Sequence, residues 1–278
     1  MIWELRHTHK LSLLLAASGL PRSTYYYYAK RRAKPEKYGE VKAQIIEIYR
    51  QNKGRYGYRR ITDELHNRGK VVNHKTVQRL MREIGLFCRV RMKKYNSYKG
   101  EVGRIAPNLL DRNFRADRPN EKWVTDVTEF SLLGCKLYLS TILDLYNGEI
   151  VSFNLNEHPN FHQTVDMLEK AFSRIPSGTS LTLHSDQGWQ YQMRRYQKML
   201  ADKGIRQSMS RKGNCLDNAV MENFFGHLKS ELLYLQDFET IEHFKQELLE
   251  YLDYFNNRRI KRKLGGLSPV QFRLKTAA

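Results

Sequence analysis

Residues 181–188 have the sequence LTLHSDQG, an apolar run that ends in a carboxylate and is broken at once by a glutamine and a glycine. This pattern predicts a short buried strand with Asp186 at its mouth. Thirty-five residues separate Asp186 from Glu222, which falls in a segment, 218–233, with apolar side chains at helical spacing. Glu222 is about 200° of helical rotation from the packing face at Val220, so its carboxylate is predicted to face solvent or a cleft.

A third acid lies upstream on a second predicted strand. Residues 122–130 alternate with period two, and Asp126 shares one face of that strand with apolar Val124 and Phe130. A carboxylate among apolar neighbours needs a partner, and a divalent cation is one candidate. The ordinary alternative for each acid alone is a hydrogen-bonded turn or edge aspartate, or a solvated helix glutamate.

Two other acids compete with these three for a metal site. Asp144 lies just before the turn signal Asn147-Gly148, so turn chemistry explains it. Glu129 is predicted on the opposite strand face from Asp126. Neither is therefore included among the candidate ligands.

The remaining segments of this region indicate the fold class. Their periods predict three strands, a helix, a strand, a helix, a strand and two helices, an order typical of a mixed α/β sheet. In residue numbers these are strands 122–130, 136–145 and 149–156, helix 161–175, strand 181–186, helix 194–203, strand 205–210, and helices 218–233 and 239–257.

Length and composition narrow the class of protein. The chain has 278 residues with 41% hydrophobic content, enough for a large core. No apolar run approaches the roughly 18 residues of a membrane span, so we expect a soluble cytoplasmic protein that makes no membrane contact. The three cysteines are odd in number and far apart, which argues against a disulfide framework or a zinc knuckle.

Charge is segregated along the chain, whose net charge is +19. Residues 1–115 hold 27 Lys and Arg against 9 Asp and Glu, whereas residues 116–257 hold 14 against 20. The last 21 residues carry 7 basic side chains and no acid. This distribution predicts arms that bind nucleic acid around an acidic, cation-binding middle, with merely solvated basic helices as the alternative.

Two helical modules occupy the basic N-terminal region. Residues 8–32 predict two short helices around a Gly-Leu-Pro turn, the outline of a helix-turn-helix. Residues 38–84 predict three helices, and the third, capped by Asn73, has an outward face suited to bases and phosphates. From residue 88 the periodicity ends and a basic linker begins. The predicted DNA contacts in this region are Arg59, Lys75, Gln78, Arg79, Arg82, Lys93 and Lys94.

Several sequence blocks resemble those of a known superfamily. WVTDVT at 123–128, HSDQG at 184–188, and Asp217-Asn218-Ala219 followed by ENFF at 222–225 and Lys229 are similar to the three blocks of the DDE transposases and retroviral integrases. The separation of the second aspartate from the glutamate equals that family's spacing. More narrowly, YGYRRI at 56–61 and LGGLSP at 264–269 resemble the OrfB transposases of the insertion-sequence group numbered three, nearest its one-fifty branch.

The resemblance implies an RNase H-like catalytic core and a set of metal ligands. Asp126, Asp186 and Glu222 would be the catalytic residues and would hold two Mg²⁺ or Mn²⁺ ions, with Asp126 bridging both. The implied chemistry is in-line phosphoryl transfer on double-stranded DNA. Water would attack at the ends of the element, and the freed 3′-hydroxyl would then attack target DNA.

Supporting roles follow from the same resemblance. Lys229, two helical turns after Glu222, would contact a terminal phosphate, with an ordinary surface lysine as the alternative. Asn218 would orient the glutamate one turn further on, and His184 would steady the second aspartate unless it is a packed strand histidine. Arg259 belongs to a block similar to the family's Tyr-Asn-x-x-Arg and would contact DNA, with a plain basic tail as the alternative.

These inferences define a transposase of five segments. Because no leucine zipper is visible, the upstream-frame product OrfA is an expected partner, together with a second copy of the chain on DNA, in the bacterial cytoplasm at the nucleoid. The alternatives are a DNA-binding regulator without catalysis and an RNase H-like nuclease that never joins strands. The expected segments are a helix-turn-helix-like segment over residues 1–35, a helix-turn-helix domain 36–90, a basic linker 91–117, a catalytic core 118–235 and a C-terminal helix with a basic tail 236–278.

Overall fold

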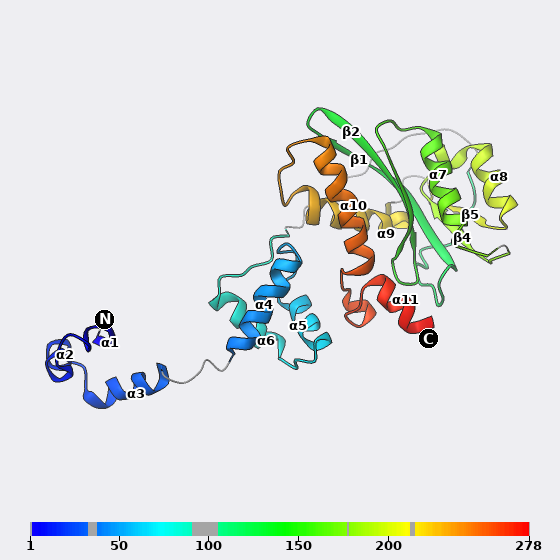
Figure 1. Cartoon of the computed structure of the whole chain (residues 1–278). Helices are drawn as coiled ribbons and strands as arrows, with labels where there is room; N and C mark the ends of the chain where they lie inside the picture. Colours follow the sequence, from blue (N-terminus) through cyan, green and yellow to red (C-terminus); the bar gives the residue numbers. More distant parts are fainter. Residues whose placement is uncertain (1, 33–37, 91–104, 177, 212–214, 278) are drawn as a thin grey trace.

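The computed structural model describes residues 2–32, 38–90, 105–176, 178–211 and 215–277. A mixed sheet with helices on both faces forms the main body, a module of three helices lies beside it, and a small N-terminal helical unit stands apart (Figure 1). None of the helices in these ranges combines the length and apolarity that a bilayer crossing requires.

The sheet has five strands in the order β3-β2-β1-β4-β5. Strands β1 (Lys122–Leu132), β2 (Cys135–Asp144) and β3 (Ile150–Asn156) form an antiparallel meander. Strands β4 (Thr182–Ser185) and β5 (Arg206–Met209) run parallel to β1. The predicted strands and their mixed α/β order are confirmed.

Each face of the sheet is covered by helices that the apolar periodicity predicts. Helices α7 (Phe161–Phe172) and α8 (Arg194–Asp202) pack on the face that carries Trp123 and Ile142. Helices α9 (Ala219–Leu228) and α10 (Ile241–Asn257) pack on the other face. The predicted single helix 218–233 differs at its end, because α9 continues from Lys229 to Leu233 as a π-helical turn.

The basic N-terminal region is helical as predicted. Helices α1 (Ile2–Leu5), α2 (Leu11–Ser18) and α3 (Arg22–Arg32) form the N-terminal unit, in which Tyr25 is buried and the next three tyrosines are exposed. The second module consists of α4 (Gly39–Gln51), α5 (Tyr58–Asn67) and α6 (His74–Glu83). Asn73 caps α6 as expected, since its side chain accepts the Lys75 N–H at 2.8 Å.

The described half of the expected linker belongs to the catalytic body. The segment meets β5 at residues 107–109, where the Leu109 N–H donates to Ser208 Oγ at 2.9 Å and the Met209 N–H donates to the Pro107 carbonyl at 3.3 Å. Leu110 is buried in the core. The linker interpretation is wrong for these residues, because hydrogen bonds to β5 and this buried side chain hold them on the body without any apolar period. Residues 91–104 lie outside the described ranges.

The C-terminal segment also packs on the body. Helix α11 (Pro269–Ala277) follows a short 3₁₀ turn, Arg262–Leu264, and lies beside the β2–β3 hairpin. Asn147 donates to the Pro269 carbonyl at 2.9 Å, and Arg273 pairs with Glu149 at 2.7 Å. This end of the chain is therefore more than a basic tail.

Candidate active site

The sheet register places the two aspartates side by side. Thr125 of β1 is paired with Ser185 of the parallel neighbour β4. Asp126 is the next residue of β1, and Asp186 is the first residue after β4 ends, so this register places the two aspartates side by side where β4 ends. The apolar run and the glycine break that predicted the mouth of a strand at Asp186 are confirmed.

The electrostatics of this pair are unfavourable without a cation. Burial raises the pKa of Asp126 well above its usual range, and the negative charge of Asp186 raises it further. Burial likewise raises the pKa of the Asp186 carboxyl. Neutral groups donate to both side chains: Val127 N–H to Asp126 Oδ1 at 2.7 Å and Gly188 N–H to Asp186 Oδ1 at 2.9 Å. Neutral donors do not offset two adjacent negative charges.

Glu222 reaches the same region from the first turn of α9, and it is only partly exposed. Its charge acts on Asp126 and raises the pKa of that aspartate, although less than Asp186 does. In the described ranges, no three His, Cys, Asp or Glu side chains are close enough together to hold one ion. The charges of both Asp186 and Glu222 thus act on Asp126, and the three acids lie in one region.

Asn218 and His184 support this region differently from expectation. Asn218 Nδ2 donates to Asp126 Oδ2 at 2.9 Å, so it orients the first aspartate and the prediction that it orients Glu222 is wrong. His184 is fully buried and its ring nitrogens lie 2.8 Å from Ser208 Oγ and 3.0 Å from the Asp217 carbonyl. It is the packed strand histidine of the alternative interpretation, and it holds the backbone just before Asn218.

Asp217 is neither a helix cap nor a free acid. Its buried carboxylate accepts from Arg211 Nε at 2.9 Å and from Arg112 Nε at 3.1 Å. The Arg211 guanidinium holds the pKa of Asp217 far below its usual range. Asn108 also donates to it at 3.0 Å. This cluster ties residues 105–117 to the turn that presents Asn218.

Lys229 lies near the acids, as its helical position predicts. Its amine is 5.7 Å from the centre of the Phe130 ring, and its charge interacts with Glu129 and Asp126. Burial lowers the pKa of Lys229. The two rival acids are explained as expected: Glu129 pairs with Lys136 at 3.1 Å, and Asp144 accepts backbone N–H groups of the adjoining turns.

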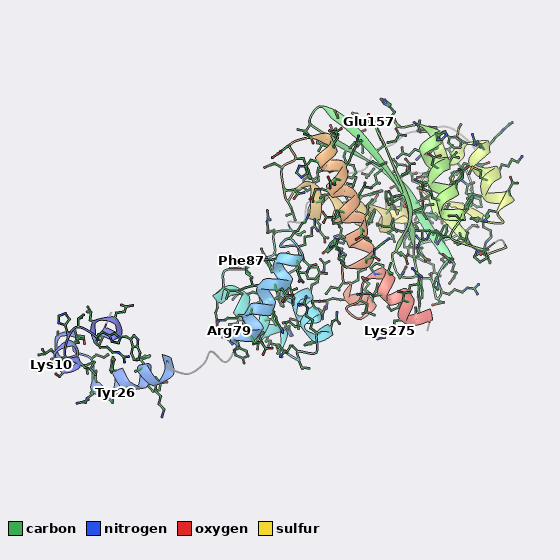
Figure 2. All side chains as sticks on the ribbon, in the orientation of Figure 1. Lys10, Tyr26, Arg79, Phe87, Glu157 and Lys275 are labelled. Carbon is green, nitrogen blue, oxygen red and sulfur yellow. The ribbon has the colours of Figure 1, made fainter. Side chains whose placement is uncertain are left out.

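Five of the predicted DNA contacts lie in the described part of the α4–α6 module. On α6, Lys75, Arg79 and Arg82 are exposed and Gln78 is half-buried, and Arg59 is exposed at the start of α5. Arg79 lies on the side of the module turned away from the sheet (Figure 2) and pairs with Glu83 at 2.5 Å. Lys93 and Lys94 lie outside the described residues.

Arg259 is not a DNA contact, and that prediction is wrong. Its guanidinium is 3% exposed and donates to both carboxylate oxygens of Glu231, at 2.6 and 2.8 Å. A charge that is buried and doubly paired cannot reach a phosphate. Asn256 of the same block is likewise internal, since its side-chain amide bonds the backbone of Ile150 in both directions, at 2.8 and 2.9 Å.

Glu231 and Gly188 are residues that the sequence reasoning missed. Glu231 falls seven residues after Phe224 and three after Leu228, on the apolar stripe, and an acid on a buried stripe signals a need for a buried partner. Gly188 was used only as a strand break. A Cβ there would lie 2.9 Å from Asp186 Oδ1, so the glycine leaves room for the carboxylate.

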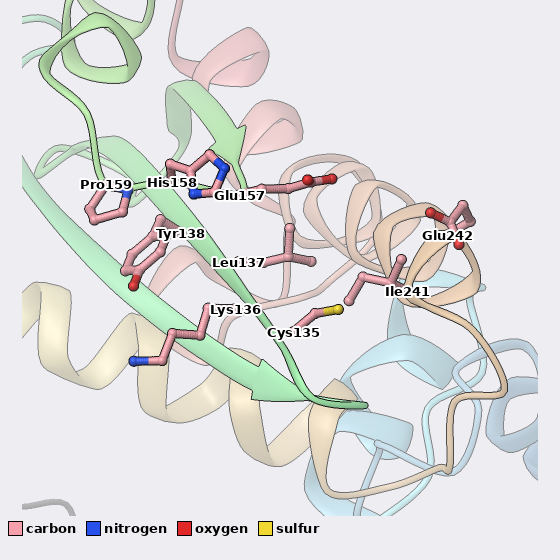
Figure 3. A pocket seen from close by; sticks show the side chains of 9 residues that line it. All are labelled: Cys135, Lys136, Leu137, Tyr138, Glu157, His158, Pro159, Ile241 and Glu242. Carbon is pink, nitrogen blue, oxygen red and sulfur yellow. The ribbon is translucent and has the colours of Figure 1, made fainter.

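A cavity of about 550 Å³ lies elsewhere, between the start of β2, the end of β3 and the start of α10 (Figure 3). Cys135, Lys136 and Glu157 are among its lining residues, and none of the predicted site residues is. The acids lie outside this cavity, where β1, the end of β4 and the start of α9 come together.

Comparison with known proteins decides the family. Residues 116–215 match a family model described as an integrase core domain, residues 222–276 match a second integrase core model, and residues 37–94 match an HTH-like domain. The InsK transposase of insertion sequence element IS150 from Escherichia coli strain K12 is 55% identical over 98% of this chain and 96% of its own. The chain belongs to the insertion-sequence transposases.

A second transposase is also similar over most of the chain. The transposase of insertion sequence element IS904 from Lactococcus lactis subsp. lactis strain IL1403 is 35% identical over 87% of this chain and 97% of its own. Among solved structures, the HTLV-2 integrase catalytic core domain in complex with magnesium is 21% identical, covers 56% of this chain and 98% of its own, and has a TM-score of 0.46.

The family confirms the main sequence predictions. This transposase has an RNase H-like integrase core preceded by a helical DNA-binding region, and it is a DNA-processing phosphoryl-transfer enzyme that cleaves DNA and transfers strands. The two alternatives, a silent regulator and a pure nuclease, are not what the family indicates.

Proposed function

We propose that Asp126, Asp186 and Glu222 are the catalytic acids of this transposase and hold two Mg²⁺ or Mn²⁺ ions. The observation that carries the proposal is the register of β1 and β4, which brings two carboxylates side by side where β4 ends, each accepting a backbone N–H. Hard divalent cations prefer carboxylate oxygens. The donor set therefore fits such ions.

The residues that would hold the ions are the three acids. The charges of Asp186 and Glu222 both act on Asp126. Asp126 would therefore be the acid able to serve either ion, with Asp186 and Glu222 as the further carboxylates.

When bound, the ions would neutralise charge on the attacking and leaving oxygens of an in-line displacement. The protein supplies position. Asn218 and the Val127 N–H fix both oxygens of Asp126, and the Gly188 N–H fixes Asp186. Lys229 would hold a phosphate beside the acids. Most of the catalysis is then orientation and charge complementarity.

DNA would be held by the helical module. The exposed Lys75, Arg79 and Arg82 on α6 suit the major groove and its phosphates, as expected for the HTH-like domain. We further propose that the transposase acts as an oligomer on the two ends of its element, and that an OrfA product of an upstream frame contributes end recognition.

The test is strand transfer by the purified chain. Labelled duplexes carrying the ends of the encoding element are incubated with Mg²⁺ and wild type, Glu222→Gln or Glu169→Gln, the last an exposed acid of α7. Joined product is expected from wild type and Glu169→Gln only. Nicked DNA without joined product would favour the nuclease, and equal binding without any cleavage would favour the regulator.

A further inference from the structure

A buried ionic network joins the α4–α6 module to the catalytic helix. Glu231, in the π-helical turn that continues α9, is 2% exposed. Besides Arg259, its carboxylate accepts from the Tyr251 hydroxyl of α10 at 3.0 Å and from Arg60 Nη1 of α5 at 3.4 Å. Glu231 thus links the catalytic body, helix α10 and the DNA-binding module.

Arg55 and Tyr56, just before α5, add buried contacts between the α4–α6 module and the catalytic body. Arg55 is buried, donates from Nε to the Glu231 carbonyl at 2.9 Å, and lies over the Tyr254 ring at 4.8 Å. The buried Tyr56 hydroxyl donates to the Arg258 carbonyl at 3.1 Å and accepts the Ile260 N–H at 3.0 Å. Buried polar networks whose members are satisfied allow few other arrangements.

Exposed contacts and a shared core surround this network. Figure 1 shows α10 between the sheet and the α4–α6 module, and buried side chains of both belong to one apolar cluster. The module is therefore docked on the catalytic body. Three polar contacts frame the buried network: Lys53 with Glu247 at 3.0 Å, Asp63 with Arg262 at 3.2 Å, and Asn67 with the Gly266 carbonyl at 2.8 Å.

We propose that Arg60 and Glu231 are positioning residues for strand transfer. They would hold the DNA that α6 binds at one fixed position relative to Glu222. Glu222 and Glu231 lie on one continuous helical segment, 219–233, so a contact at its end fixes the glutamate at its start. π-helical turns are frequent at functional sites. The proposal rests on the proposed function, because it takes Glu222 as a catalytic acid.

The first test separates positioning from folding. Arg60→Gln is compared with Arg174→Gln, which removes an arginine paired with Glu149 inside the catalytic body at 2.9 Å. We expect Arg60→Gln to bind element-end DNA within about twofold of wild type, to lose about tenfold in joined product and to cut at bonds beside the normal one. Arg174→Gln should cut at the normal bond. If Arg60→Gln joins DNA at the wild-type rate and bond, the proposal is overturned.

A charge swap provides rescue. Asp63→Arg places two cations together at the rim of the interface, so the variant should cut DNA at several bonds instead of one. Adding Arg262→Asp restores a pair of opposite charges and should restore cutting at the single bond. Failure of the double variant to recover, when Asp63→Arg alone is defective, would count against a positioning role for this interface.

A distance measurement tests docking without any strand transfer. Nitroxide labels are placed on Cys135 of β2 and on Val71→Cys, a 92% exposed position between α5 and α6, with Cys88→Ser and Cys215→Ser. We expect one narrow distance distribution, broadened by Arg60→Gln. A broad distribution before that change overturns the proposal. If wild type makes no joined product although the distribution is narrow, the proposed function fails and the docking stands.

Discussion

Asn218 donates from Nδ2 to Oδ2 of Asp126 at 2.9 Å, across 92 residues of sequence. The Val127 N–H donates to the other carboxylate oxygen at 2.7 Å, so neither oxygen can turn away. His184 holds the carbonyl of Asp217, the residue before Asn218, at 3.0 Å. The Asn218 amide is thus anchored through the strand that precedes Asp186. The orientation of Asp126 therefore depends on how that strand packs.

Removing this amide should slow catalysis more than binding. Asn218→Ala leaves Asp126 Oδ2 without its donor, and partners of metal ligands typically contribute about 10–100-fold in metal affinity or activity. We expect strand transfer to fall by that factor while affinity for element-end DNA stays close to wild type. Asn257→Ala, which removes a surface amide bonded to Asp253 at 2.8 Å, is the matched control. An Asn218→Ala protein as active as this control would contradict the role.

The acids should destabilise the metal-free protein. Burial and the charge of Asp186 raise the pKa of Asp126, so the ionised form costs folding free energy near neutral pH. Asp126→Asn should therefore raise the free energy of unfolding without metal by on the order of 1 kcal/mol. Melting curves with and without Mg²⁺ or Mn²⁺ check this.

The same curves test the metal site. Added metal should raise the melting temperature of wild type, since a ligand that binds only the folded state stabilises it. Asp126→Asn should not respond. Equal shifts in both proteins would mean that the ions bind elsewhere.

Strand transfer should require glycine at position 188, because a side chain there would crowd the Asp186 carboxylate. A Cβ there would lie 2.9 Å from Asp186 Oδ1 and 2.6 Å from Gln190 Nε2, so both side chains would have to shift. Gly188→Ala is expected to displace the carboxylate and to reduce strand transfer about tenfold or more with the fold intact. Circular dichroism and the joining assay measure both. The control is Gly226→Ala in α9, where nothing lies within 4 Å and helix propensity should add about 0.5–1 kcal/mol of stability.

The sequence predicts the places of the acids in the fold because each of those predictions depends on a local pattern. Period-two alternation places Asp126 on its face, a glycine break ends the strand at Asp186, and helical rotation turns Glu222 from the packing stripe. Sheet pairing then joins the aspartates without further information. The spacing between Asp186 and Glu222, which equals that of the family, indicates Glu222 as the third acid.

Contacts between distant segments were less predictable. Asn218 was assigned to its neighbour along the helix because nothing in the sequence shows a bond to Asp126. The resemblance of its block to that of the family predicts a DNA contact for Arg259, and nothing in the sequence shows that a buried acid on another helix holds it. Residues 105–117 have no period because a few separate contacts hold them, such as the bonds to β5 and the buried Leu110.

The buried pair of Glu231 and Arg259 should make stability depend on acid pH. Burial alone would raise the pKa of Glu231, but Arg259 dominates and lowers it to about 2. The unfolded carboxyl titrates near 4.3, so the stabilisation is complete above that pH and is lost as pH falls toward 2. Glu231→Gln leaves Arg259 buried without its counter-charge and should cost about 3–5 kcal/mol at neutral pH.

Urea unfolding from pH 2.5 to 7 measures this difference, which should shrink below about pH 4.3 as wild type loses the same interaction. Burial also lowers the pKa of His227 to about 4, so that side chain adds its own acid instability and wild type must be compared with the variant at each pH. Glu157→Gln, which removes an exposed pair with Lys245, should follow the wild-type curve. A wild-type advantage that persists undiminished at pH 2.5 would show that the carboxylate is not the stabilising form, because a carboxyl with a lowered pKa must bind its proton more weakly when folded.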